Sequence, residues 1–198
     1  MLERVELRDP AIGPTDDALF AQWQAGNDRA FDTLVERHGP ALLGFLRMLL
    51  GSRSAAEDAW SESWIRVIRA RDRYQPEGHF RAWLFTIGRR CAKDQKRSLR
   101  RRLNLGLAVK ERAPPPRAVT SPHLRLARSE DARALDATLS ELKEEHRTVL
   151  LLTYRYDLSS EEVGQVLGLT GQQVRSRVTY ARRLLQAALE KKGVGDDR

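Results

Sequence analysis

The sequence predicts an all-α protein with two helical domains joined by a basic, proline-rich linker. Apolar residues recur at spacings of three and four through most of the chain, which is typical of amphipathic helices, and no stretch alternates as a β-strand does. The segment 113–123, APPPRAVTSPH, cannot continue a helix because proline fixes φ and removes a backbone donor. We therefore expect a tail (1–14), a first domain (15–102), a flexible linker (103–129), a second domain (130–192) and a C-terminal tail (193–198).

Composition limits the classes of function. The 198 residues carry 35 Lys and Arg against 27 Asp and Glu, a formal net charge of +8, which favours a polyanionic partner. The single cysteine, Cys91, excludes a disulfide framework or a cysteine-rich zinc site within one chain and indicates a cytoplasmic setting. The most apolar run, 41–50, is too short to span a bilayer, so no membrane insertion is expected. No cofactor or metal is expected either.

Each helix of the first domain has its own signal. Thr15 or Asp16 can cap a helix that Gly26 ends, and GSRS at 51–54 supplies a loop and a cap. The loop 73–79 is marked by its proline and glycine. The expected helices run from about residue 16 to 25, from about Phe31 to Leu50 with a possible kink at Gly39-Pro40, from Ala55 to Arg71, and from Phe80 to about Arg102.

The second domain ends in a helix-turn-helix pattern. Ser159 precedes Glu162 by three residues, a capping-box spacing, and Gly168 suits the left-handed residue that ends a helix. Thr170 and Gln173 repeat the capping signal two residues later. Two short helices around so tight a turn are typical of DNA-binding proteins.

The last helix is rich in hydrogen-bond donors on one face. Glutamine can pair bidentately with adenine and arginine with guanine in the major groove, while other basic side chains contact phosphates. The alternative is a solvated face on an ordinary helical hairpin, but no acidic residue occurs from Gly171 to Gln186. The candidate DNA-reading residues are Gln172, Gln173, Arg175, Ser176, Thr179, Arg182 and Arg183.

The segment 79–102 mixes aromatic residues with dense positive charge. Trp83, Leu84 and Ile87 recur at helical spacing and are expected in the core. Tyr74, His79 and Phe80, in and beside the loop, are candidates for contacting an unstacked base. The basic residues that could bind nucleic acid here are Arg81, Arg89, Arg90, Lys93, Lys96, Arg97, Arg100, Arg101 and Arg102.

The helix before it carries two tryptophans one turn apart, Trp60 and Trp64. Acidic residues near the start of this helix interact favourably with the positive end of the helix dipole. We expect one tryptophan in the core and the other exposed beside the acids, where it could bind a protein partner.

Taken together, these motifs resemble the extracytoplasmic-function (ECF) sigma factors of bacterial RNA polymerase. The family pattern D-A-x-Q-E-x-F-x-R appears at 58–66, with Ser61 for glutamine and Trp64 for phenylalanine. The pattern F-R-x-W-L-x-x-I-A-R-N appears at 80–90, with Gly88 and Arg90 as departures. The pattern G-T-V-K-S-R appears at 172–177, with its first two residues replaced by glutamine.

The resemblance implies a role for each domain. The first would be sigma region 2, which binds the polymerase clamp and recognises and helps melt the −10 element. The second would be region 4, which reads the duplex −35 element and meets the polymerase flap. The implied residues are Asp58, Ser61, Glu62, Trp64, Ile65 and Ile68 for core polymerase; Tyr74, His79, Phe80, Arg81, Arg89, Arg90, Lys93 and Arg97 for the −10 element; and Thr170 and Arg177, with the seven residues above, for the −35 element.

The resemblance also implies partners and control. The linker would thread through the polymerase, the free protein would be a monomer, and an anti-sigma factor would hold it inactive. One rival is a stand-alone helix-turn-helix regulator that binds an operator without polymerase, usually as a symmetric dimer. The other is an enzyme, which the scattered histidines and the lack of a catalytic motif disfavour, so we assign no catalytic residue.

Overall fold

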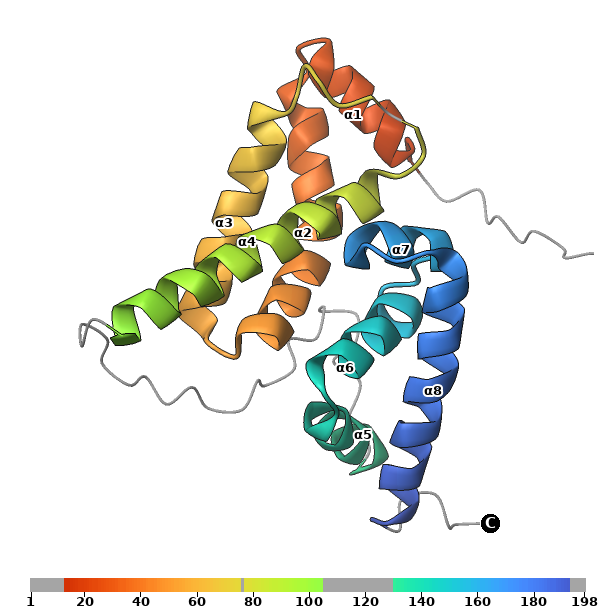
Figure 1. Cartoon of the computed structure of the whole chain (residues 1–198). Coiled ribbons are helices and arrows are strands. Elements are labelled where there is room, and N and C mark those ends of the chain that lie inside the picture. The colour runs from red at the N-terminus through yellow and green to blue at the C-terminus, as the bar shows by residue number, and fades with distance from the viewer. Residues whose placement is uncertain (1–12, 76, 105–129, 193–198) are drawn as a thin grey trace, which may run out of the picture.

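The structure, a computed structural model, describes residues 13–75, 77–104 and 130–192, and all regular elements among them are helical (Figure 1). This confirms the all-α class. The N-terminal tail up to residue 12, the predicted linker from residue 105 onward and the C-terminal tail lie outside the described residues. The elements are α1 (Asp16–Gln24), α2 (Asp28–Leu50), α3 (Arg53–Arg69), α4 (Phe80–Asn104), α5 (Glu130–Glu141), α6 (Glu144–Leu150), the π-helical turn η2 (Leu151–Arg155), α7 (Ser160–Leu167) and α8 (Gly171–Glu190).

Two helices of the first domain, α1–α4, begin at predicted caps. Thr15 caps α1, because its hydroxyl accepts from the amide of Ala18 at 3.2 Å, and Ser52 caps α3. Pro40 lies inside α2 without ending the helix. The carbonyl of Gly39 accepts a hydrogen bond from Trp60 Nε1 at 3.0 Å, which ties α2 to α3 at this point.

An aromatic cluster closes the core of the first domain. The Phe20 ring lies 4.5 Å from Tyr74, 5.7 Å from Phe80 and 6.0 Å from Trp83, centroid to centroid. Tilted and edge contacts at these distances add to the stabilisation from burial. The cluster fixes α1 and the 70–79 loop against the start of α4.

Gly88 allows α2 and α4 to approach closely. A Cβ at this position would lie 2.6 Å from Leu42 Cδ1, closer than real contacts allow. Leu42 is fully buried and has little room to move. The close approach therefore accounts for glycine at this departure from the family pattern.

In the second domain, α5, α6 and α7 pack against α8, and both predicted capping boxes are present. The Ser159 hydroxyl accepts from the Glu162 amide while the Glu162 carboxylate accepts from the Ser159 amide. Gly168 ends α7 at φ +73°, which favours glycine. The helix-turn-helix prediction is confirmed.

The two domains lie against each other, with α7 packed along α4 (Figure 1). Tyr156 is buried at the junction, and its ring centroid lies 5.1 Å from Phe85 and 6.1 Å from Phe45. Burial raises the pKa of Tyr156 to about 12, so its hydroxyl stays protonated. The sequence did not predict this contact.

A sharp corner in the backbone aims Tyr156 at the first domain. The amide of Tyr156 donates to the carbonyl of Leu151 at 3.0 Å, which completes the π-helical turn. The next residue, Asp157, has φ +48°, a left-handed conformation that aspartate tolerates better than most residues. We call the segment 156–158, with buried Tyr156 and Leu158 at its ends, the Tyr156 corner.

Gly164 gives a test of the packing around the turn. A Cβ there would lie 2.5 Å from the carbonyl oxygen of Leu169, a backbone atom that cannot move aside cheaply. We expect Gly164→Ala to lower the stability of the second domain by ~1–3 kcal/mol, an overpacking cost, in urea or thermal unfolding. Gln165→Ala, an exposed position on the same helix, should change stability by less than ~0.5 kcal/mol. Equal effects of the two substitutions would contradict the close contact.

Candidate nucleic-acid interface

Helix α8 presents a continuous polar stripe. A shallow surface depression is lined by residues spaced three and four apart, which therefore share one face of the helix. On the opposite side Val174 and Ala181 are buried and hold α8 in the domain. The depression is lined by Gln172, Arg175, Ser176, Thr179, Tyr180 and Arg183, five of which the sequence analysis selected.

Two other selected residues form the helix cap. Gln173 Oε1 accepts from the amide of Thr170 at 2.9 Å, and Thr170 Oγ1 accepts from the amide of Gln173 at 3.2 Å. Gln173 would have to give up this bond to pair bidentately with adenine in the geometry we expected. In the structure, both side chains order the first turn of α8.

The remaining two selected residues on α8 lie off the stripe. Arg177 lines a cleft between the two domains, together with Arg89 and Lys93 of α4. Arg182 is exposed but does not line the depression. The arginines of the candidate −35 set therefore point in different directions.

Tyr180 belongs to the stripe but was not selected. Its side chain is 55% exposed, and its ring lies 5.3 Å from the His146 ring in a T-shaped contact. The candidate DNA-reading residues on α8 were glutamine, arginine, serine and threonine, so tyrosine was not among them. The i+4 spacing from Ser176 would have placed the residue on the same face.

Phe80 corrects the predicted −10 set. We expected its ring to contact an unstacked base, but it is 1% exposed and lies within the aromatic cluster. Its position is explained by the helical spacing of the buried residues Leu84 and Ile87, which share its face of α4. Phe80 is therefore a core residue in this structure.

Its neighbours in the loop differ from one another. Tyr74 is half-buried, with its ring centroid 4.1 Å from that of Trp83, and burial followed by the charges of Asp17 and Asp16 raises its pKa. Its hydroxyl is buried and has no hydrogen-bond partner among the described residues. His79 is exposed at the start of α4. Of the three loop candidates, only His79 is fully presented to solvent.

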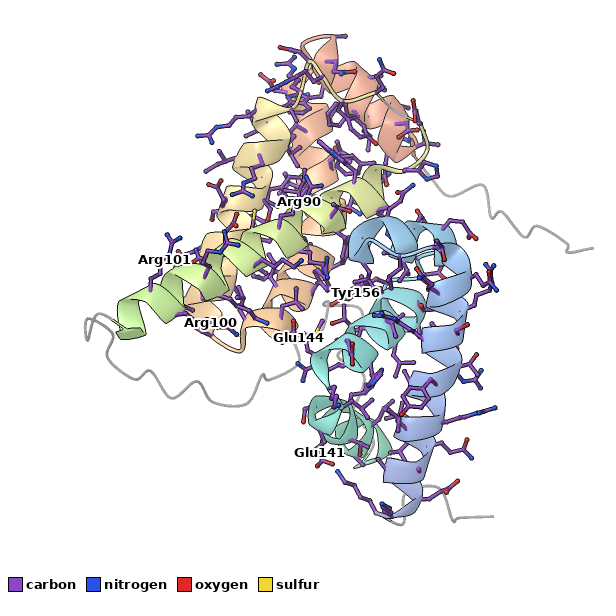
Figure 2. All side chains as sticks on the ribbon, in the orientation of Figure 1. Arg90, Arg100, Arg101, Glu141, Glu144 and Tyr156 are labelled. Carbon is purple, nitrogen blue, oxygen red and sulfur yellow. The ribbon has the colours of Figure 1, made fainter. Side chains whose placement is uncertain are left out.

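The basic residues of α4 divide between two faces. We call the face that meets the second domain the inner face; it comprises Arg81, Arg89, Lys93 and Lys96. Arg90 and Arg97 are exposed and make no such contact among the hydrogen bonds described. Figure 2 shows the consecutive residues Arg100 and Arg101 leaving α4 on different sides.

Two inner-face arginines are already engaged. The guanidinium of Arg81 donates to the carbonyl of Tyr156, and Arg89 Nη1 donates to the carbonyl of Val166 at 3.3 Å. Burial lowers the pKa of Arg89, because the closed interface removes water from its charge.

Helix α3 carries a second stripe, which is polar in its N-terminal half and apolar in its C-terminal half. Asp58, Ser61, Ile65 and Ile68 are all exposed and are spaced three or four residues apart. Ile65 is 41% exposed and Ile68 is 49% exposed, so the stripe presents two large apolar side chains to solvent. Glu62 lies beside the stripe and holds Arg66 at 2.9 Å.

Trp64 is the buried tryptophan of the pair. It is 5% exposed, and its ring lies 5.7 Å from Phe31 and 6.2 Å from Trp60. Trp60 is half-buried rather than fully exposed. Trp64 therefore supports the α3 stripe from inside instead of presenting its ring to a partner.

Two family models match the chain in the order of its domains. Residues 34–102 match Sigma-70 region 2, and residues 138–187 match Sigma-70, region 4. Together the matches cover more than half of the chain. The chain belongs to the sigma-70 family.

Similar proteins place this sigma-70 family member among the ECF sigma factors. It is 33% identical to the RNA polymerase sigma factor CnrH of Cupriavidus metallidurans, over 88% of this chain and 94% of that protein. It is 32% identical to the ECF RNA polymerase sigma factor SigE of Mycolicibacterium smegmatis, over 92% of this chain and 71% of that protein. The first domain is hereafter called region 2 and the second region 4.

Solved structures of ECF relatives have a similar fold. CnrH in complex with the cytosolic domain of CnrY gives a TM-score of 0.64 at 32% identity, covering 89% of this chain and 97% of CnrH. RpoE in complex with the anti-sigma factor NepR, from Bartonella quintana, gives 0.63 at 25% identity, covering 85% and 98%. Both neighbours were solved with a protein bound.

Among the described residues, no helix of this sigma factor is both long and apolar enough to cross a membrane. Within the same residues, histidine, cysteine and acidic side chains do not gather in threes that could hold a metal ion. The buried thiol of Cys91 has a raised pKa, mainly because of burial, which disfavours the reactive thiolate.

The burial of Phe80 can be tested by its effect on folding. We expect Phe80→Ala to lower the free energy of unfolding by ~3–5 kcal/mol, because it removes a fully buried ring from the aromatic cluster. His79→Ala, at the exposed neighbouring position, should cost less than ~0.5 kcal/mol. Urea unfolding followed by tryptophan fluorescence measures both. A Phe80→Ala protein of wild-type stability would return Phe80 to the candidate DNA surface.

Proposed function

We propose that this protein is a sigma factor that binds bacterial core RNA polymerase and directs it to promoters with −35 and −10 elements. The observation that carries the proposal is the exposed donor stripe of α8, in a region 4 that follows a region 2 with its own exposed α3 stripe. One chain thus offers separate surfaces for duplex DNA and for a protein.

In the proposed complex, α8 enters the major groove at the −35 element. Arg175 and Gln172 lie in the first turns of the helix, where base edges are read. Arg175 is held by Glu161 at 3.2 Å, but both side chains are exposed, so the pair is weak and can exchange for a base or phosphate. Thr179 and Arg183, further along the stripe, suit contacts to the DNA backbone.

The α3 stripe is the proposed contact with core polymerase. Ile65 and Ile68 supply apolar area at its C-terminal end, and Asp58 and Ser61 extend it with polar groups toward the N-terminus of α3. A surface that places polar groups beside exposed apolar side chains is typical of protein interfaces.

The proposed −10 surface is α4 and the loop before it. His79, Arg90 and Arg97 are exposed, and Arg81, Arg89 and Lys93 add positive charge on the inner face. Basic side chains attract the unpaired strand, and capture of an extruded base offsets part of the cost of unpairing, a few kcal/mol. The polymerase fixes the distance between the two domains and makes the second DNA contact effectively intramolecular.

The proposed role places the protein in the cytoplasm, where it acts by binding and performs no catalysis. By likeness to the complexes of CnrH and RpoE, we propose that an inhibitory protein binds it. The alternative, a regulator that acts without polymerase, leaves the exposed isoleucines of α3 without a role.

Transcription in vitro tests the proposal. The protein would be added to sigma-free bacterial core polymerase with fragmented DNA from its own genome, and transcript starts mapped. Defined starts that share two spaced upstream elements are expected. No starts, with tight operator binding by the protein alone, would instead support the stand-alone regulator.

The α8 stripe can be tested on a promoter identified in this way. Arg175→Ala should weaken discrimination at one −35 base pair by ~1–3 kcal/mol, because a bidentate contact is lost. Arg182→Ala, off the stripe on the same helix, removes the same charge but should leave base preference unchanged. Binding to a panel of single-base promoter variants measures both effects, and relaxed preference in Arg182→Ala alone would show that we have chosen the wrong face.

The α3 stripe can be tested by affinity for core polymerase. Ile68→Asp puts a charge on the apolar part of the stripe and should weaken binding by roughly tenfold or more. Ser54→Asp, an exposed position at the start of the same helix, adds the same charge outside the stripe. Fluorescence anisotropy with labelled protein measures affinity, and wild-type binding by Ile68→Asp would exclude this surface.

A further inference from the structure

We propose that region 4 is an intramolecular inhibitor of region 2: it docks through the Tyr156 corner onto α2 and α4, covers the inner face of α4, and must leave before that face can bind −10 DNA. The docking itself is independent of the proposed function. Its inhibitory effect rests on the proposed −10 role of α4.

The apolar part of the interface is a specific fit. Tyr156 and Leu158 of region 4 are each less than 7% exposed, and the Tyr156 ring packs against Phe45 and Phe85 of region 2. Gly44 leaves room for the tyrosine, since a Cβ there would lie 3.2 Å from its hydroxyl and within 4 Å of nothing else. Both rings of region 2 are fully buried in the closed form. Opening would expose their apolar area to water, and this exposure costs free energy that stabilises the closed form.

The polar part of the interface uses the proposed DNA-binding groups. Arg81 and Arg89 donate to backbone carbonyls of region 4, at Tyr156 and Val166. Lys96 Nζ lies 2.6 Å from Glu144 Oε2, and Arg147 donates back to the carbonyl of Met48 at 3.5 Å. Region 4 thus occupies the space that a phosphate or base would take beside Arg81 and Arg89.

The same interface contains a cleft in which the charged side chains of the two regions face each other. Arg89, Lys93 and Lys96 of region 2 line a cleft with Arg177 of region 4, against only two carboxylates, Glu144 and Glu145. Figure 2 shows Glu144 at the edge of region 4 nearest region 2, and Glu141 at its far end. The three cations of region 2 therefore face a net negative charge on region 4, where two carboxylates outweigh Arg177, so the charges across the cleft favour closure and add to the Tyr156 corner.

Closure should reduce DNA binding by a predictable factor. When only a fraction of molecules is open, the apparent dissociation constant rises by the inverse of that fraction. If one molecule in ten is open, single-stranded DNA should bind about tenfold more weakly than it does to a fully open variant.

The first measurement is the distance between the domains in the full-length protein. Dyes on Glu36→Cys in α2 and Gln186→Cys in α8 report it by energy transfer, and Cys91, which is 1% exposed, should not react. The wild type should be mainly closed. Gly44→Leu, which wedges Tyr156 away, and Glu144→Lys, which places a third charge beside Lys93 and Lys96, should both lower the transfer.

Glu141→Lys is the matched control. Glu141 lies 2.7 Å from Lys192 within region 4, so this substitution breaks a similar ion pair and makes the same change in charge without touching region 2. It should leave the closed distance unchanged. A wild-type protein that is open in solution, or equal opening by Glu141→Lys and Glu144→Lys, would overturn the proposed docking.

The second measurement is affinity for a short fluorescent single-stranded oligonucleotide of mixed sequence, without polymerase. Gly44→Leu should bind about tenfold more tightly than the wild type, because it changes no charge and only frees the inner face. Glu144→Lys should gain more affinity for the oligonucleotide than Glu141→Lys does. The comparison corrects for the added charge, because both substitutions change the charge equally. If the wedge variant opens but binds no better, region 4 docks without inhibiting; this outcome differs from failure of the sigma proposal, which is judged by transcript starts.

Discussion

The structure depends on the packing of α4, a single helix that serves both the core and the surface. Its apolar stripe, from Phe80 through Leu84 and Ile87, is buried against α2 and α3. That burial fixes the rotation of the helix, and therefore fixes which basic residues face region 4 and which face solvent. Gly88 permits the close approach to Leu42 on which the arrangement depends.

The sequence predicted those features whose physical causes are local. Capping boxes, a left-handed glycine and helical spacing act over a few residues, so both helices of the helix-turn-helix were correctly expected. Helical spacing could also have identified Phe80 as a core residue, because it shares a face with Leu84. We ranked its position beside a basic loop above that spacing, and the error followed from the ranking.

The contact between the domains could not be predicted in the same way. Arg81 and Tyr156 are separated by 75 positions, and neither carries a local signal that selects the other. In the sequence, Tyr156 is simply an aromatic residue that follows an apolar run. The backbone turn formed by η2 and Asp157 points its side chain away from its own domain. Likewise, the donor face of α8 was predicted as a set, but the assignment of Thr170 and Gln173 to the cap required the positions of their side chains.

The reciprocal cap of Thr170 and Gln173 has a consequence for the selectivity of the proposed DNA recognition. Because Thr170 and Gln173 bond reciprocally, the first turn of α8 is ordered before any DNA is present. Its backbone and the attached Gln172 and Arg175 have less conformational freedom to lose on binding than a fraying helix end would have. An element that is rigid in advance is selective, since it adapts poorly to a groove whose base edges do not match. Under the proposed opening of the two domains, adaptability lies instead in their relative movement, which leaves the surface of α8 unchanged as its position varies.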